Sequence, residues 1–467
     1  MDNDTPLEIG LTKSLIGNTS VVPERKLWVR QREVGMERRD LFRISGIGAL
    51  AASGMALPRV AFSSDREQVS DAVPSRDLVA RLRAVAAQPV LRRSLLGNTP
   101  IIVERIDILR RDDQYFVRIM DTDGGVGWTL TNNRRFPDFW PVLQNRIAPF
   151  FIGKDLRDYE ALLEGVYLED SNYKWQGLPF WSAIARLELA VLDLFGKRLD
   201  LPINRLLGDP VRDSTGVYYA NGDRERSAEW VVERLQRDVG TSGARAVKFK
   251  LGARMHQTEQ SDARDSALIP MVRDAFGPDM VIYADANGSY DVESALHFGR
   301  MLEEHDYGFF EEPVPFDHLI ENKIVADSLA VPIAGGEQDS SMRALEWHLA
   351  TDSLQIVQPD LIYFGGLVRS MRVARMAALL GKQTVPHISG RGLGSLYATH
   401  FASLLENTTD YQEYKGDPDE VPYEMTLGGG RFVARDGRLP VPQGAGLGIT
   451  FDPDYLSSLQ QITESCA

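Results

Sequence analysis

The sequence has almost no cysteine: the only one among its 467 residues is Cys466. An intrachain disulfide is therefore excluded, and so is a metal site built from several thiolates. The chain also lacks an apolar run of the ~18 residues that a membrane-spanning helix needs. Basic residues are not in excess, because 52 Lys and Arg stand against 66 Asp and Glu, a formal net charge of −14. This balance argues against a nucleic-acid-binding protein, which would show a basic face.

What remains is an ordinary globular composition, with 43% apolar and 25% charged residues. The length predicts two to four domains, or one large barrel with additions. Residues 1–35 show no periodicity and are predicted to be a disordered extension.

Two basic residues mark a second N-terminal feature. Arg38 and Arg39 precede an apolar pair and a Gly/Ala-rich stretch, which resembles a twin-arginine export signal within residues 36–65. The signal predicts a periplasmic or otherwise exported protein whose translation starts at Met36. The alternative is a short basic helix with a chance arginine pair, in a cytoplasmic protein.

Three further regions follow. Residues 66–96 have helical spacing and are predicted to form a linker helix. Residues 97–210 contain three segments that alternate as antiparallel strands do and then three helical stretches, which predicts an α+β unit. The strands are expected within 101–111, 114–124 and 126–132, and the helices around 138–150, 155–166 and 178–197.

Residues 211–415 repeat one pattern. Strand-like segments recur about every 25 residues, which is the length of one strand, one helix and two short loops. Strands that alternate with helices predict a parallel sheet, and eight of them predict a closed barrel. The Gly/Pro-rich segment 416–467 no longer keeps this spacing and is expected to pack back on the α+β unit. The eight segments are 216–222, 246–252, 280–288, 308–314, 332–338, 354–360, 384–390 and 410–414.

Carboxylates end three consecutive predicted strands, at Asp285, Glu311 and Glu337. In a parallel barrel the carboxyl ends of all strands face one mouth, and active sites lie there. Neighbouring strand ends are ~5 Å apart, so these acids would converge and repel one another. Mg²⁺ prefers such oxygen ligands and removes the repulsion. The pattern predicts a magnesium site, against the alternative of three separate salt-bridge partners or helix caps.

Two neighbours of these acids differ in direction. Glu312 points away from the face that carries Glu311, because side chains alternate along a strand, and is expected to be structural. Asn287 lies on the same face as Asp285 and is expected to contact substrate.

Lysines and a histidine flank the acids. Lys248 and Lys250 point the same way from one strand, and two ammonium groups in one mouth are expected to lower each other's pKa. Lys250 would then serve as a general base, whereas Lys248 also neutralises the acids. Asp360 and His387 end two later strands, and a carboxylate that accepts one imidazole N–H leaves the other nitrogen for substrate. The alternative for His387 is a purely structural group.

One further acid completes the set. Glu413 ends the eighth predicted strand and is expected to donate a hydrogen bond to a substrate oxygen if it is protonated.

These motifs together resemble the enolase superfamily and, within it, the mandelate racemase subgroup, over roughly residues 97–460. The resemblance implies an α/β fold, a (β/α)₇β barrel of the TIM type under an α+β capping domain. It also implies that Asp285, Glu311 and Glu337 hold Mg²⁺. The motifs are Lys248-x-Lys250, Asp285-x-Asn287, Glu311-Glu312-Pro313, Gly336-Glu337, Pro359-Asp360 with Gly365-Gly366, and His387.

The resemblance implies further that Lys250 and His387 are the two bases and that Asp360 orients the histidine. Many sugar-acid dehydratases of this group have a histidine where this chain has Gln338, which puts a gluconate- or galactonate-type substrate in doubt. Glu413 matches the family's electrophilic glutamate by position only.

The implied reaction is removal of the α-proton of a carboxylate substrate, through an enediolate. Dehydration of a sugar acid to a 2-keto-3-deoxy acid is favoured because it is the commoner outcome in the subgroup. A racemase, an epimerase or a cycloisomerase is the second expectation, and a non-catalytic sugar-acid-binding protein is a third of another class. The expected partner is a small carboxylate rather than a nucleic acid or a membrane, and a homo-oligomer is expected.

Overall fold

The computed structural model describes residues 74–130, 135–387, 392–416 and 421–462. All of them belong to one compact unit that starts at Ser64. The predicted extension 1–35 and export signal 36–65 lie outside the described residues, as does Cys466. Within the described ranges, no helix combines the length and the apolar character that crossing a membrane requires.

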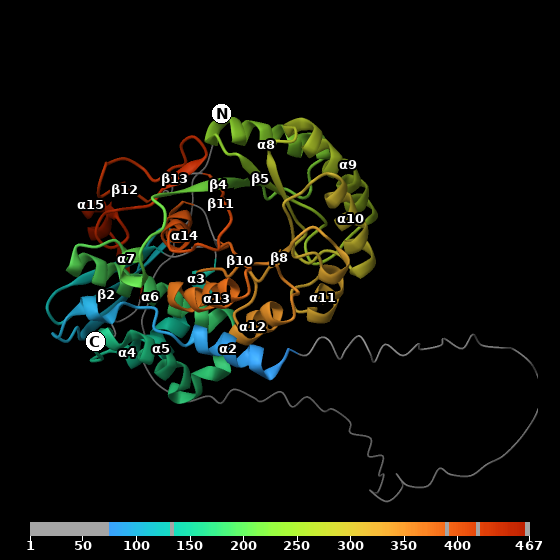
Figure 1. The fold of residues 1–467 in the computed structure, drawn as a ribbon. Coiled ribbons are helices and arrows are strands. Elements are labelled where there is room, and N and C mark those ends of the chain that lie inside the picture. Colours follow the sequence, from blue (N-terminus) through green and yellow to red (C-terminus); the bar gives the residue numbers. More distant parts are fainter. Residues whose placement is uncertain (1–73, 131–134, 388–391, 417–420, 463–467) are drawn as a thin grey trace, which may run out of the picture. The chain divides into compact units, whose positions relative to one another are not determined.

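Eight parallel strands form one curved sheet in the order β10-β9-β8-β7-β6-β5-β4-β11. Figure 1 shows them as a ring with helices outside it. The described residues form no ladder between β10 and β11, although the Thr384 amide donates to the Asn407 carbonyl at 2.9 Å beside β10. The strands are β4 (Ser214–Ala220), β5 (Ala246–Lys250), β6 (Val281–Asp285), β7 (Phe309–Glu311), β8 (Ile333–Gly335), β9 (Ile356–Val357), β10 (Gln383–Thr384) and β11 (Tyr411–Tyr414).

Every predicted barrel strand is present, and most are shorter than the predicted segments. The predicted strand 280–288, for example, ends at Asp285, after which Asn287 takes a positive φ of 42°. Ladder pairing stops where the chain turns outward at the mouth, so residues expected at strand ends can lie in the loops that follow. The predicted TIM-like barrel is confirmed.

Helices that follow the strands cover the outside of the ring (Figure 1). Their buried faces repeat at helical spacing, as in α10, where Ala295, Phe298 and Leu302 are buried. Inside the ring, beneath the mouth, stacked rings of Tyr283 and Phe309 lie 3.9 Å apart and help to fill the interior. The helices are α8 (Ala228–Ser242), α9 (Glu259–Phe276), α10 (Val292–Glu304), α11 (Leu319–Ser328), α12 (Met342–Ala350), α13 (Leu367–Leu379) and α14 (Leu393–Ala402).

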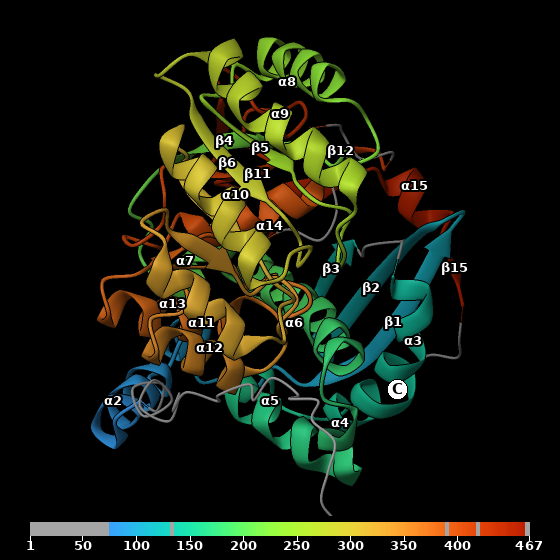
Figure 2. The same ribbon diagram turned by 90° about the vertical axis from the view of Figure 1, so that its right-hand side faces the viewer.

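The capping domain contains an antiparallel sheet in the order β15-β1-β2-β3 (Figure 2). Strand β15 (Gln460–Gln461) comes from the C-terminal segment and pairs with β1 (Val103–Arg111), next to β2 (Gln114–Asp121) and β3 (Val126–Leu130). The cap also contains α3 (Phe136–Val142), a π-helical turn (Leu143–Ile147), α4 (Ala148–Phe151), α5 (Tyr159–Leu168), α6 (Leu178–Leu199) and α7 (Ile203–Leu207). Short 3-10 turns span Arg93–Leu96, Leu156–Asp158 and Glu169–Trp175.

The C-terminal segment contacts the barrel as well as the cap. Strand β13 (Arg438–Pro440) pairs antiparallel with β4, which the sequence did not predict. The segment also forms a two-stranded sheet of β12 (Tyr423–Met425) and β14 (Ile449–Phe451), followed by α15 (Pro453–Ser457).

The helix within the predicted linker is α2 (Arg76–Ala86), and it packs against α12 and α13 instead of connecting two domains freely. Its Leu82 is fully buried in the apolar layer outside the barrel, and Arg83 pairs with Glu346 of α12 at 2.8 Å. Part of the expected linker is therefore an outer layer of the barrel.

Helix α6 joins cap and barrel through a buried carboxylate. Glu188 is fully buried and accepts the Val368 amide at 3.0 Å, at the start of α13. Gly366 has a φ of 101°, and a Cβ there would meet the Glu188 carboxylate, so glycine is needed for this approach. Burial outweighs the hydrogen bonds and raises the pKa of Glu188 to about 7.

Glu188 is expected to make stability fall with pH. Its carboxyl has a pKa of about 7 when folded against an ordinary 4.5, so its contribution is complete below pH 4.5 and is lost as pH rises through 7. Glu188→Gln should remove this loss, on the order of 2 kcal/mol between pH 5 and 8. Urea unfolding at several pH values measures it, and parallel pH dependences of wild type and variant would contradict it.

Candidate active site

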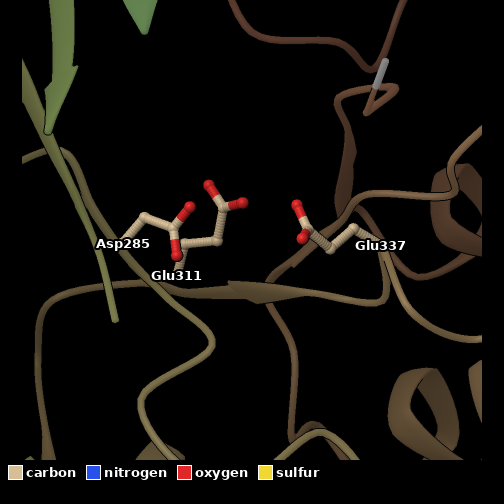
Figure 3. Close-up of side chains that lie close together, drawn as sticks. All are labelled: Asp285, Glu311 and Glu337. Carbon is tan, nitrogen blue, oxygen red and sulfur yellow. The ribbon is translucent and has the colours of Figure 1, made fainter. Parts of the chain in front are cut away.

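Three buried carboxylates meet at the barrel mouth. Asp285 and Glu311 are the last residues of β6 and β7, and Glu337 lies two residues after β8. One oxygen from each lies within 4.8 Å of those of the other two. Figure 3 shows the side chains pointing toward one another from their separate segments. The register explains this convergence, because Asp285 pairs with Glu311 directly across the ladder.

The electrostatics of this triad favour a cation. Burial and the charge of Asp285 raise the pKa of Glu311 to about 7. Burial also disfavours the carboxylate form of Asp285. The positive charges of Lys250 and Lys248 outweigh this effect and lower the pKa of Asp285. Glu311 Oε1 is buried without a hydrogen-bond partner in the described part of the chain. An all-oxygen set with an unused ligand atom fits a hard divalent cation such as Mg²⁺.

Both lysines of β5 reach the acids. Lys248 is fully buried, and its Nζ lies 2.5 Å from Glu311 Oε2 and 3.6 Å from Asp285 Oδ2. Lys250 Nζ contacts Asp285 and lies 3.1 Å from Asn287 Oδ1.

The expected lowering of pKa does not occur at Lys248. Burial disfavours its charge, but the carboxylates of Glu311, Glu413 and Asp285 outweigh burial and raise its pKa. Lys248 is therefore a fixed positive charge of the site, as its neutralising role requires.

Asp360 and His387 form the predicted pair. They follow β9 and β10 as an isolated parallel bridge, and His387 Nδ1 lies 2.6 Å from Asp360 Oδ2. The amides of Ile362 and Tyr363 donate to Asp360 Oδ1 at 2.8 and 2.7 Å, which fixes the carboxylate. His387 Nε2 consequently faces the mouth, 3.1 Å from Glu337 Oε2. Burial disfavours the imidazolium form of His387. The charges of Glu337 and Glu413 and the hydrogen bond to Asp360 outweigh burial and raise the pKa of His387.

Glu413 is present at the site in a different state from the one expected. Its carboxylate lies 3.6 Å from His387 Nε2, 3.7 Å from Lys248 Nζ and 3.4 Å from Lys415 Nζ. These cations outweigh burial and lower the pKa of Glu413. Three nearby positive charges therefore favour the carboxylate, whereas the predicted hydrogen bond to substrate requires the protonated form.

Asn287, which is predicted to contact substrate, is hydrogen-bonded to four protein groups. Its Nδ2 donates to Glu312 Oε2 at 3.0 Å and to Glu337 Oε1 at 3.2 Å, and its Oδ1 accepts from Lys250 and Arg224. An amide has two donor hydrogens and two lone pairs, so these contacts use its full capacity. Asn287 instead connects the strand ends of the mouth.

Glu312 lies outside the triad. It lines a small cavity together with Asp339 and His348, and its Oε2 accepts from Asn287 Nδ2 at 3.0 Å. Its burial and the nearby acids Glu337 and Asp285 raise the pKa of Glu312 well above its usual range. Glu312 follows the last residue of β7 and has a φ of 43°, so strand alternation does not set the direction of its side chain.

Sequence reasoning missed two cations of the site. Arg224 lies in the loop after β4, and its guanidinium contacts Asn287 and donates to the Leu251 carbonyl at 3.3 Å. Lys415, directly after β11, faces Glu413. Lys415 is a charged residue next to a strand end, and that position is the signal that could have identified it. Arg224 lies farther along the loop after β4, where the strand pattern gives no such signal. Gln338, the noted departure, donates to Glu337 Oε1 at 2.7 Å.

Known proteins resemble this chain in sequence and in fold. A model of the enolase C-terminal domain-like family matches residues 230–455. A solved mandelate racemase/muconate lactonizing protein from Paracoccus denitrificans is 30% identical, with a TM-score of 0.71, and the match covers 78% of this chain and 99% of that one. The chain belongs to the mandelate racemase subgroup of the enolase superfamily. A Paracoccus denitrificans structure described as complexed with magnesium is also 30% identical, with a TM-score of 0.70 and the same coverage.

Curated members of this superfamily resemble the chain at lower identity. The arabinonate dehydratase of Saccharolobus solfataricus is 28% identical over 341 residues, which are 71% of this chain and 86% of that protein. The D-galactarolactone cycloisomerase of Agrobacterium fabrum is 27% identical over 355 residues, or 74% and 90%.

The triad predicts a measurable metal affinity. Asp285→Asn or Glu311→Gln should weaken Mg²⁺ binding by more than about 100-fold, because loss of residues that merely support ligands already costs 10–100-fold. Calorimetric titration with Mg²⁺ measures the affinity. Glu346→Gln, which removes a buried carboxylate of α12 that pairs with Arg83 and does not belong to the triad, is the matched control and should bind Mg²⁺ like the wild type. Equal affinities in all four proteins would place the cation elsewhere.

Proposed function

We propose that this enzyme is a Mg²⁺-dependent dehydratase that converts a sugar acid to a 2-keto-3-deoxy acid by removing the α-proton of the carboxylate. One observation carries the proposal: two groups able to move protons lie at opposite ends of the carboxylate triad. Lys250 contacts Asp285 at one end, and His387 Nε2 lies 3.1 Å from Glu337 at the other. Lys250 ends β5 and His387 follows β10, and strands β6 to β9 lie between these two strands in the sheet.

Each residue has a defined task in this reaction. Mg²⁺, when bound, supplies positive charge that stabilises the substrate carboxylate oxygens as the α-carbon loses its proton. Lys248 adds a fixed charge from the same side. Lys250 accepts the α-proton, and the C–H electron pair moves toward the carboxylate to form the enediolate. The enediolate then expels the β-hydroxyl and forms the Cα–Cβ double bond. His387, held by Asp360, gives the departing hydroxyl its proton, so water leaves and the enol tautomerises to the keto acid.

The comparisons support dehydration over the alternatives. Proteins named as dehydratases of arabinonate, xylonate and galactonate are among the relatives of this chain. Epimerisation or cycloisomerisation would use the same two bases, and a cycloisomerase is also among the relatives.

A library of aldonic and aldaric acids, incubated with protein and Mg²⁺ in D₂O, tests the proposal. Keto-acid formation from at least one acid is expected. Deuterium at the α-carbon with no keto acid would indicate an epimerase or cycloisomerase instead. Binding without any exchange would indicate a non-catalytic binding protein.

An α-proton exchange experiment should distinguish the roles of the two bases, Lys250 and His387. Lys250→Ala and His387→Ala should each lower dehydration by about 10³-fold, within the range of general acid–base catalysis. Only Lys250→Ala should also abolish exchange of the substrate α-proton with deuterium, because His387 acts after that proton has left. NMR follows both reactions, and Lys323→Ala on the outer face of α11 serves as the control. Wild-type turnover in either site variant would refute the two-base assignment.

We also propose that the arginine pair at residues 38 and 39 directs export. The support is the sequence pattern alone, an arginine pair before an apolar pair and a Gly/Ala-rich stretch. Replacing both arginines by lysine should retain the protein in the cytoplasm, as cell fractionation would show. An unreplaced chain that fractionates with cytosol would contradict the proposal.

A further inference from the structure

Helix α9 carries two adjacent, oppositely charged residues whose side chains contact the backbone near the carboxyl ends of the barrel strands. Arg264 and Asp265 lie in the second turn of the helix, after its N-cap Thr258. Asp265 is fully buried, and the Arg264 side chain is 8% exposed. Their side chains pair with each other, since Arg264 Nε and Nη2 lie 2.9 and 2.5 Å from Asp265 Oδ1.

Arg264 binds the backbone of two strand ends. Its Nη2 donates to the carbonyl of Lys250 at 2.9 Å, and its Nη1 donates to the carbonyl of Arg224. Those carbonyls belong to the end of β5 and to the loop after β4. One planar guanidinium therefore holds two neighbouring segments at a fixed separation, which a lysine side chain with a single nitrogen cannot do.

Asp265 binds the segments that follow β5 and β6. Its Oδ2 accepts the Gly252 amide at 2.7 Å and the Tyr290 hydroxyl at 2.6 Å. Gly252 follows β5, and Tyr290 follows β6, where its ring stacks on Phe298 at 4.7 Å. The pair thus connects the end of β5, which carries Lys250, with the loop after β4, which carries Arg224, and with the segment that follows Asp285 of β6.

The loop between β5 and α9 needs such support. Arg254 and Met255 both have positive φ, 61° and 60°, a conformation that persists in residues other than glycine only when the surroundings impose it. The Arg254 amide donates to Ser289 Oγ at 3.0 Å, and the Met255 amide donates to the Asn287 carbonyl at 3.0 Å. The strained turn is therefore tied to the segment after β6, as Gly252 is through Asp265.

We propose that Arg264 and Asp265 are positioning residues that set the Lys250 side of the proton-transfer site. The inference rests on the proposed function and deepens it, because it assigns the placement of Lys250, one of the two proposed bases, to helix α9. Lys250 has a long flexible side chain, so the place of its Nζ depends on where its backbone is held. Arg264 and Asp265 fix that backbone at the Lys250 carbonyl and at the Gly252 amide two residues later.

The effect of Arg264 and Asp265 should be confined to the Lys250 side of the site. None of the contacts described for Arg264 or Asp265 reaches Asp360 or His387, and Asp360 is held by the amides of Ile362 and Tyr363. Loosening α9 from the mouth should therefore impair proton removal by Lys250 and leave the histidine where it is. A general loss of stability would not discriminate between the two bases.

Arg264→Met in the His387→Ala protein is the decisive variant, because α-proton exchange there runs through Lys250 alone. Exchange should fall by about 10²-fold, the cost of a misplacement of about 1 Å, while substrate KM changes by less than about threefold. Arg264→Lys should restore part of the rate, because one ammonium can still reach one carbonyl.

Arg273→Met is the matched control. Arg273 lies on the same helix and also binds backbone carbonyls, of His305, Gly277, Met280 and Asp306, at the end remote from the mouth. It should leave exchange in the His387→Ala protein unchanged. Equal losses from Arg264→Met and Arg273→Met, or no loss from Arg264→Met, would overturn the proposal.

Amide hydrogen exchange tests the same inference without a substrate. Arg264→Met should speed exchange in segments 221–228 and 250–256 and leave the segment around Asp360 unchanged, whereas Arg273→Met should change neither. Unchanged exchange in both mouth segments would refute the positioning role. If no sugar acid is turned over by the wild type, the proposed function fails, and this measurement still decides whether the pair holds the mouth. If Arg264→Met does not fold, Arg264→Lys takes its place in both measurements.

Discussion

The mutual repulsion of three buried carboxylates is the constraint on which the mouth of this barrel depends. Oxygens of Asp285, Glu311 and Glu337 lie within 4.8 Å of one another. At an effective dielectric constant of about 20, each such pair of unit charges costs on the order of 3 kcal/mol. Ammonium, guanidinium and imidazole groups of the surrounding residues offset this negative charge. The triad itself is suited to a divalent cation. A fold that brings these acids together has to bring the cations with them.

The barrel meets that requirement through register. Parallel strands put the last residue of each strand beside the last residue of the next, so Lys250, Asp285 and Glu311 are neighbours in one row of the ladder. Lys248 lies two residues earlier on the same face and therefore contacts the triad from beneath. A slip of one residue in β5 would turn both lysines out of the barrel, so the pairing of β5 with β6 is also a condition for the chemistry.

The sequence predicted what depends on spacing and alternation, and it failed where side chains compete for partners. The positions of Asp285, Glu311 and His387 follow from strand ends that face one mouth, a rule that needs no side-chain detail. The roles of Asn287 and Glu413 could not be predicted in the same way. The first is committed to four protein groups, and the second keeps its charge because three cations lie within 4 Å. Arg224 was missed because it lies beyond its strand, in a loop whose course periodicity does not describe.

The two ends of the site are held in different ways, and the difference matters for chemistry. On the histidine side, one carboxylate is fixed by two amides of its own loop and in turn fixes the ring, so a local turn is sufficient. On the lysine side, the flexible side chain of Lys250, the proposed base, extends from a backbone that α9 contacts through Arg264 and Asp265. A rigid imidazole needs only its partner, whereas an ammonium on a four-carbon stem needs its backbone placed first. The helix behind the strand is therefore as much a part of the proton-transfer geometry as the strand that carries Lys250.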